Sequence, residues 1–277
     1  MTITTAREST PSMATSRARA SRAQLARWAL QDTATMVWRD VVRTARQPEM
    51  LTFAVVMGSF FLVLFNYVFG GVIAAGAGVD YLQFLVPGVL VITALQGAQQ
   101  TSTSFAADLA EGVTERLRSL PMSNVAVIAG RTLADALRNV VGLSLVVLLA
   151  LLMGYRFPSP AAAVAAIGLA TVVGLGFSWL GAAIAAKVRQ PDMVGMLSMF
   201  WLFPLMLAST AFAPAESMPG WLQPIARYQP VSVTADAVRA LAAGDFSGGS
   251  LLPALAWTVI LLAVFVPLSV RLYRRMP

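Results

Sequence analysis

The chain of 277 residues contains no cysteine, no histidine and a single lysine. Without cysteine and histidine, disulfides, thiolate nucleophiles, Cys/His metal sites and histidine general bases are all excluded. The lysine, Lys187, lies in AAKVRQ. This is not the GxxxxGKS/T pattern of a P-loop, whose lysine reaches the nucleotide phosphates. We therefore expect that this chain binds no cofactor or metal and is not itself an enzyme.

Charge is also scarce. Only 12% of the residues are charged and 57% are hydrophobic, with a mean hydropathy of +0.71. Soluble domains carry about 25% charged residues, so the composition predicts an all-α integral membrane protein. The net charge is +7. The basic residues flank apolar runs and form no basic face with interleaved aromatics, which favours anionic lipid over nucleic acid as their partner.

Six apolar runs are long enough to cross a bilayer as helices. In the first, Leu51–Phe69 gives 19 residues, about 28 Å of helix against a hydrocarbon layer of about 30 Å. We expect residues 49–277 to form one six-span domain. The predicted spans are residues 50–73, 81–107, 133–154, 161–186, 193–212 and 251–270.

Two segments precede the first span. Residues 1–21 are rich in Ser, Thr, Ala and Arg without an apolar core, which predicts a disordered tail. An organelle transit peptide is the alternative. Residues 22–48 combine an apolar side that includes Trp28 with a basic side, so we expect an amphipathic helix in the membrane interface. An ordinary positively charged flank is the other interpretation.

The basic residues are distributed unevenly between the two sides of this predicted bundle. Most of the 20 lysine and arginine residues lie in the N-terminal flank, the 108–131 connection, the Lys187 turn and the C-terminus. By the positive-inside rule these four regions are cytoplasmic, with both termini inside a bacterial plasma membrane. The connection 213–250 is then external.

The charged connection Asp108–Arg131 separates the second and third runs. Leu109, Val113, Leu117 and Leu120 recur at intervals of four, four and three, which places them along one side of a helix. Pro121 ends that predicted helix, which covers about Asp108–Leu120. It could rest on lipid or contact another protein. Just beyond it, Asp135 and Arg138 are three residues apart and are predicted to pair.

The second and fifth runs carry candidate substrate contacts. Residues 96–104 hold seven polar side chains, which could line a path or simply bond neighbouring helices. The fifth run is rich in methionine and aromatics, which suit varied apolar ligands and also plain packing. The candidate path residues are Gln96, Gln99, Gln100, Thr103, Met196, Met199, Phe203 and Met206.

The predicted external connection is too apolar for a free loop. Residues 214–230 read PAESMPGWLQPIARYQP, and four prolines prevent a long helix. We expect a re-entrant helical hairpin that dips into the outer leaflet, with Trp221 and Tyr228 at the interface. A loop packed flat on the surface is the alternative. A further helical piece is expected at residues 231–243.

These features together resemble the ABC-2 type transporter permeases, and in particular the daunorubicin-resistance type. The similar sequence segments are EGVTERLRSLPMSNVAVIAGR at Glu111–Arg131 and MPGWLQPIARYQPVSVTADAVRAL at Met218–Leu241. With the topology, the likeness covers about residues 22–275. It implies a permease subunit of an exporter for a hydrophobic drug-like molecule or lipid. Alternatives are a permease for a glycan or lipid-linked polymer, a lipid-modifying enzyme and a proton-coupled transporter.

The resemblance also implies partners. Two separate ATPase subunits would bind ATP and magnesium, and a second permease, identical or related, would complete the complex. The helix after the second span would be the coupling helix that seats in the ATPase, and spans one, two and five would frame the substrate path. Carried over to this chain, the coupling residues are Leu109, Glu111, Val113, Glu115, Arg116, Leu117, Arg118 and Leu120.

Overall fold

The computed structural model describes residues 48–77, 80–112 and 124–274. Within these ranges the regular structure is entirely helical. The predicted tail 1–21 and the interfacial helix 22–48 fall almost wholly outside them. The helices are α3 (Pro48–Ala77), α4 (Tyr81–Ala110), α6 (Asn124–Leu152), α7 (Pro160–Val188), α8 (Pro191–Leu207), η1 (Ala215–Ser217), α9 (Gln223–Tyr228), α10 (Pro230–Ala242) and α11 (Leu251–Arg274).

Each of the six predicted spans overlaps one of the helices α3, α4, α6, α7, α8 and α11. Among the described residues, four helices are long and apolar enough to cross a membrane: α4, α7, residues 134–152 of α6 and residues 251–272 of α11. The apolar stretches Val55–Val68 of α3 and Pro191–Leu207 of α8 are shorter. The fold is therefore a multi-helix membrane bundle with at least four spanning helices.

The fifth predicted span ends five residues early, at Leu207. Pro204 lies in the last turn of α8, and the Ser209 hydroxyl donates to the Met206 carbonyl and accepts from the Ala211 N–H. A hydroxyl that bonds local backbone in this way competes with the helical ladder. Residues 208–213, which we call the α8 exit segment, therefore leave the helix and pack inward.

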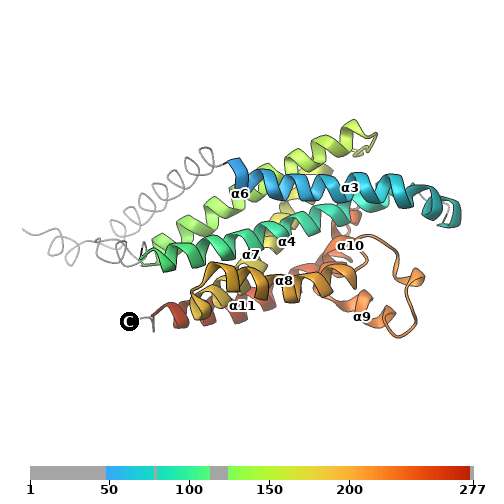
Figure 1. The fold of residues 1–277 in the computed structure, drawn as a ribbon. Coiled ribbons are helices and arrows are strands. Elements are labelled where there is room, and N and C mark those ends of the chain that lie inside the picture. Colours follow the sequence, from blue (N-terminus) through green and yellow to red (C-terminus); the bar gives the residue numbers. More distant parts are fainter. Residues whose placement is uncertain (1–47, 78–79, 113–123, 275–277) are drawn as a thin grey trace, which may run out of the picture.

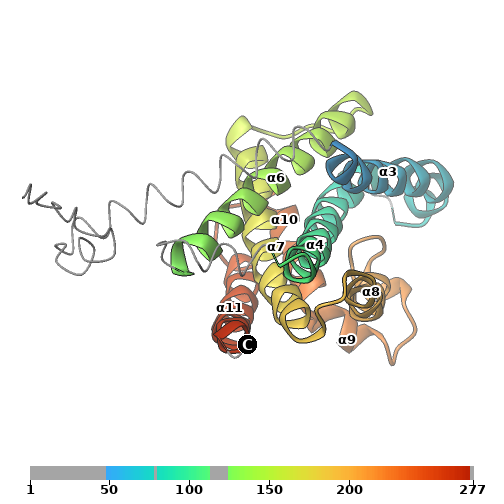
Figure 2. The ribbon, with the colours of Figure 1, turned by 60° about the vertical axis from the view of Figure 1, so that its left-hand side comes forward.

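Helix α4 is the centre of the bundle and contacts α3, α6, α7, α8 and α10 (Figure 1). In its most apolar stretch 78% of the residues are buried, against 17% in α11 at the periphery. Figure 2 shows α4 between α3 and α8 on one side and α6 and α7 on the other. Small residues permit this packing, since Gly181 of α7 meets Ser102 of α4 directly.

Helix α10 belongs to the interior, in contrast to the connection that precedes it. The predicted piece 231–243 is confirmed as Pro230–Ala242, and it packs on α4, α7 and α11. Its apolar side, which includes Val231, Ala235 and Val238, is buried. Helix α9 and the turn η1 lie outside it, linked by an ion pair of 3.0 Å between Arg227 and Glu216.

Arg239 of α10 joins three parts of the fold. Its Nε donates to the Phe84 carbonyl of α4 at 3.0 Å, and its Nη2 donates to the carbonyls of Thr210 and Ala211 at 2.5 and 3.3 Å. Its Nη1 bonds Asp236 at 2.6 Å, and the guanidinium carbon lies 3.8 Å from the centre of the Phe84 ring. This side chain therefore satisfies backbone carbonyls of the α8 exit segment that no helix could satisfy.

Candidate functional site

The polar segment of α4, residues 96–104, faces two different neighbours. Thr101 and Gln100 border a cavity formed with α6 and α7, whereas Gln99 reaches α8. The polar residues of this segment therefore do not form a single row along one side of α4. The two sides have different chemistry.

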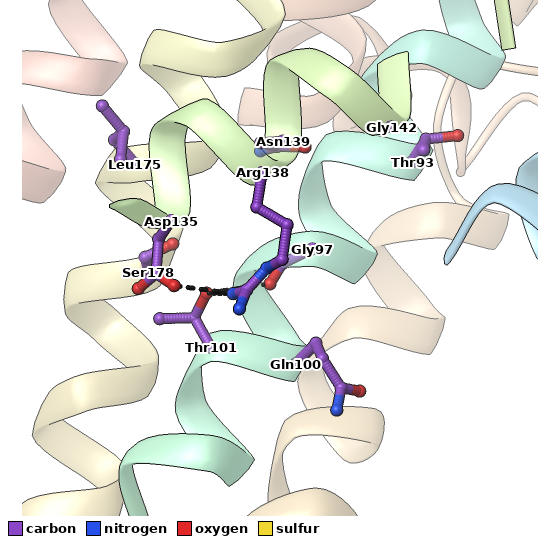
Figure 3. Close-up of a pocket in the computed structure, with 10 residues that line it drawn as sticks. All are labelled: Thr93, Gly97, Gln100, Thr101, Asp135, Arg138, Asn139, Gly142, Leu175 and Ser178. Atoms are coloured by element: carbon purple, nitrogen blue, oxygen red, sulfur yellow. Dashed lines mark hydrogen bonds and ion pairs between the residues drawn. The ribbon is translucent and has the colours of Figure 1, made fainter. Parts of the chain in front are cut away.

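On the α6 side, a buried ion pair joins the helices (Figure 3). Arg138 Nη2 lies 2.6 Å from Asp135 Oδ1 and donates to Thr101 Oγ1 at 2.9 Å. The two charged side chains are only 17% and 10% exposed. The predicted pairing of Asp135 with Arg138 is thus confirmed, and Thr101 extends it across to α4.

The cavity beside this pair has a volume of about 20 Å³, which is room for about one water molecule. Asn139 closes it from α6 and donates to the Ala94 carbonyl at 3.4 Å. In Figure 3, Gln100 lies at the edge and points away from the ion pair. A space of this size accommodates no drug-like molecule. The α6 side of α4 therefore serves to hold the helices together.

The hydroxyl groups of this segment are mostly used within α4 itself. Thr101 and Ser102 donate to the carbonyls four residues earlier, at 3.1 and 2.8 Å, and Thr103 donates to the Gln100 carbonyl at 3.0 Å. Such bonds satisfy a hydroxyl inside an apolar medium without any partner helix. For Thr103, one of the predicted path residues, this geometry favours the packing interpretation.

Helices α4 and α8 also carry buried polar atoms without partners among the described residues. Gln99 Nε2 reaches the Gly195 carbonyl at 3.5 Å. Gln96 Oε1, Ser198 Oγ and Trp201 Nε1 are buried, and within the described part of the chain they make no hydrogen bond. Leaving such atoms unpaired costs about 1–3 kcal/mol each, so their occurrence together on α4 and α8 calls for an explanation.

The sequence analysis did not select Ser198, and it took Trp201 only as one of the aromatics of the fifth run, not as a candidate path residue. Their signal was weak, because one serine and one indole in an apolar helix fit ordinary packing. Trp201 stacks on Phe177 of α7 with ring centres 5.6 Å apart, so its ring is fixed while its N–H remains unpaired.

The remaining predicted path residues divide between the two faces of α8. Met196, Met199 and Phe203 are exposed, whereas Met206 is 6% exposed and packs in the core. The exposed face continues through Phe200, at 84% exposure. Helix α3, which also flanks α4, exposes a second apolar face that contains Val56, Phe60, Val63, Leu64 and Tyr67.

The predicted coupling residues lie only partly in the described chain. Leu109 belongs to the last turn of α4, and Glu111 is its C-cap. Gly112 follows with a φ of 68°, a left-handed conformation that ends a helix. Asp108 and Leu109 therefore belong to the end of α4, and the rest of the predicted coupling helix lies outside the described residues. Outside the described residues lie Val113, Glu115, Arg116, Leu117, Arg118 and Leu120.

Trp221 and Tyr228 lie on the outer surface of the η1–α9 connection. Both side chains are exposed, as is Ile225 between them. The Tyr228 carbonyl accepts a bond of 3.2 Å from Trp257 Nε1 of α11, which ties this connection to the bundle. An exposed aromatic pair on a tethered connection suits the headgroup region of a bilayer.

Known proteins resemble this chain along most of its length. The ABC-2 type transporter family matches residues 31–242. The daunorubicin resistance ABC transporter permease protein DrrB1 of Streptomyces coeruleorubidus is 38% identical over 247 residues, which is 89% of this chain and 87% of that protein. The probable doxorubicin resistance ABC transporter permease protein DrrC of Mycobacterium tuberculosis is 26% identical over 86% of each chain. This helical membrane protein therefore belongs to the ABC-2 type transporter family, as a permease.

Proposed function

We propose that this permease is the transmembrane subunit of an ABC exporter that moves hydrophobic drug-like molecules or lipids out of the cytoplasm or the inner leaflet. Separate ATPase subunits would supply the energy, and a second permease would complete the complex. The full-length likeness to permeases named for daunorubicin and doxorubicin resistance is the observation that carries this proposal.

The substrate path runs along α3, α4 and α8, on the side of α4 away from the ion pair. The exposed apolar faces of α3 and α8 flank α4 there and have no cover within the described chain. A second permease copy can cover them and leave a path between the subunits. Buried polar atoms without a partner among the described residues occur on α4, at Gln96, and on α8, at Ser198 and Trp201. They would gain partners when the helices separate to admit water or cargo.

Coupling to the ATPase takes place through the connection between α4 and α6. That connection leaves α4 at Gly112 and enters α6 at Asn124. Asp135, Arg138 and Thr101 join the same two helices farther along. The hydrogen bond from Arg138 to Thr101 opposes separation of α4 from α6, so a force applied to the connection would move the two helices together.

The coupling assignment predicts a defined loss of function. Changing both Leu117 and Leu120 to aspartate places two charges in the apolar contact with the ATPase. We expect loss of co-purification with the ATPase, loss of ATP-dependent anthracycline uptake into inverted vesicles and loss of anthracycline efflux from cells. Phe246→Asp is the matched control, because Phe246 is an exposed apolar residue at the opposite end of the bundle.

Two results would contradict this account. A normal complex in the Leu117/Leu120 variant, properly inserted, would disprove the coupling assignment. Efflux that persists in the absence of any ATPase subunit would disprove the proposed function itself.

The six-span topology with cytoplasmic termini is the second part of the proposal. The charge bias and the exposed aromatic pair on η1–α9 support it. Because the chain has no cysteine, single cysteines report the side of the membrane directly. We expect Ser247→Cys to react with an impermeant maleimide in intact cells, and Glu111→Cys to react only after permeabilisation. Labelling of both positions from the same side would rule out this topology.

A further inference from the structure

A second cavity lies at the end of the bundle opposite the α4–α6 connection. Its volume is about 300 Å³, and it lies between the first turn of α4, the α6–α7 connection and the last turn of α10. The lining residues are Gln83, Tyr155, Arg156, Phe157, Pro158, Arg239, Ala242 and Ala243. Nothing in the proposed transport path uses them.

The polar groups that line this cavity are suited to donate hydrogen bonds. Arg156 is exposed and forms no ion pair within the described residues. Arg239 uses four of its five N–H groups in the bonds described above, so one Nη1 N–H is left. Gln83 adds an amide. Among the described residues that line the cavity, none is acidic.

Tyr155 contributes a hydroxyl donor. Burial raises the pKa of Tyr155 to about 12, and the positive charge of Arg239 only partly opposes this effect. The hydroxyl therefore remains protonated at neutral pH. Its ring is held by an edge contact with Phe157, with ring centres 4.8 Å apart.

The walls of the cavity are fixed by close packing. Gly244 adopts a φ of 84°, and a Cβ there would lie 3.2 Å from the Pro158 ring. The α6–α7 connection is thereby held against the end of α10. The carbonyl end of α10 would by itself disfavour an anion, but Arg239 in its last turn offsets that partial charge. The N-terminus of α4 on the other side is already capped by the Asp80 carboxylate, which accepts from the Leu82 N–H, so the positive charge available to an anion is that of Arg156.

We infer that this cavity binds a phosphate group, presented either by an anionic lipid headgroup or by a phosphate in solution. Arg156, Tyr155 and Gln83 approach it from two separate elements, with Arg239 at its base. A tetrahedral anion with several acceptor oxygens can accept from donors in different directions. Arginine is well suited to such a group, since its planar fork matches phosphate oxygens.

The test uses the full-length permease and three variants. Arg156→Gln removes the charge of an exposed side chain, so folding should be unaffected. Tyr155→Phe removes only the hydroxyl. Arg227→Gln is the control, because it removes an equal charge from an exposed arginine outside the cavity. In one arm, inorganic phosphate is titrated into the protein in detergent at constant ionic strength. In the other arm, the protein is released from nanodiscs that contain phosphatidylglycerol and phosphatidylcholine. Native mass spectrometry then counts the phosphatidylglycerol molecules that stay bound to it.

Loss of one charged hydrogen bond should weaken binding about tenfold or more. Phosphate binding that falls by this factor in Arg156→Gln, falls less in Tyr155→Phe and is unchanged in Arg227→Gln would establish a site for phosphate from solution. Retention of phosphatidylglycerol that is lost in Arg156→Gln, without phosphate binding, would establish a headgroup site. If Arg156→Gln and Arg227→Gln behave alike in both arms, the inference is overturned.

Discussion

Replacing Gly88 by alanine is expected to destabilise the permease by about 2–3 kcal/mol, or to prevent correct folding. Gly88 lies on α4 against the α8 exit segment, and a Cβ there would clash with the Ala211 carbonyl oxygen. It would also lie 2.7 Å from the carbonyl carbon and 2.8 Å from the Cα of Ala211. These are backbone atoms, so relief requires movement of the whole segment. The measurement is thermal unfolding in detergent, with the monodisperse fraction recorded by size exclusion.

The matched control is Gly168→Ala in α7. Nothing lies within 4 Å of a Cβ at Gly168, and alanine stabilises a helix by up to about 1 kcal/mol relative to glycine. This variant should be as stable as the parent protein or slightly more so. If Gly88→Ala unfolds at the same temperature as Gly168→Ala, then α4 and the exit segment do not approach as closely as described.

Replacing Arg239 by glutamine is expected to cost about 1–3 kcal/mol, the range for leaving buried acceptors without their donors. The Arg239 side chain is 16% exposed. Its loss leaves the Thr210 and Ala211 carbonyls without their donors and Asp236 without its ion-pair partner. Arg239→Lys should be intermediate, because an ammonium keeps the charge but cannot reach several carbonyls as a planar fork does. Thermal unfolding in detergent again provides the measurement.

Arg227→Gln is the control for Arg239→Gln as well. Its ion pair with Glu216 is 52% and 71% exposed, and exposed pairs contribute about 0–1 kcal/mol. A shift in Arg239→Gln no larger than that of Arg227→Gln would show that the carbonyl bonds of Arg239 do not stabilise the bundle.

The two predictions concern the same small region. Gly88 allows the exit segment to reach α4, and Arg239 then satisfies its carbonyls. Tyr81 adds a hydroxyl bond of 2.9 Å to the Phe212 carbonyl, and Ser232 accepts from the Thr210 N–H at 2.9 Å. The short turn after α8 is therefore held by α4 and α10 together. This explains how a nonhelical segment can be buried in a membrane bundle, because the carbonyls of Thr210, Ala211 and Phe212 all have donors.

Several features were predictable because they depend on local pattern. The long helices follow from apolar runs, and the pairing of Asp135 with Arg138 follows from a spacing of three on one helix. The piece at residues 230–242 follows from its apolar periodicity. The family could be predicted from two short sequence segments, Glu111–Arg131 and Met218–Leu241, together with the order of the spans.

Other features depend on which residues meet across the fold. The sequence shows seven polar side chains in residues 96–104, but only the packing of α4 brings Thr101 to the Asp135–Arg138 pair and leaves Gln96 Oε1 buried without a partner among the described residues. The four-residue spacing of Leu109 and Val113 suggested one helix. The left-handed turn at Gly112 interrupts it, since glycine readily adopts that conformation at a helix end.

The sequence by itself determined the membrane class, the helices, the charge bias and the lack of any nucleotide-binding motif, because each depends on composition or on neighbours along the chain. The tertiary structure alone decided the central place of α4, the inward turn after α8 and the donor-lined cavity around Arg156 and Arg239. Those features arise where residues of different helices come into contact, as Phe84 and Arg239 do across 155 positions, and no local pattern encodes such a meeting.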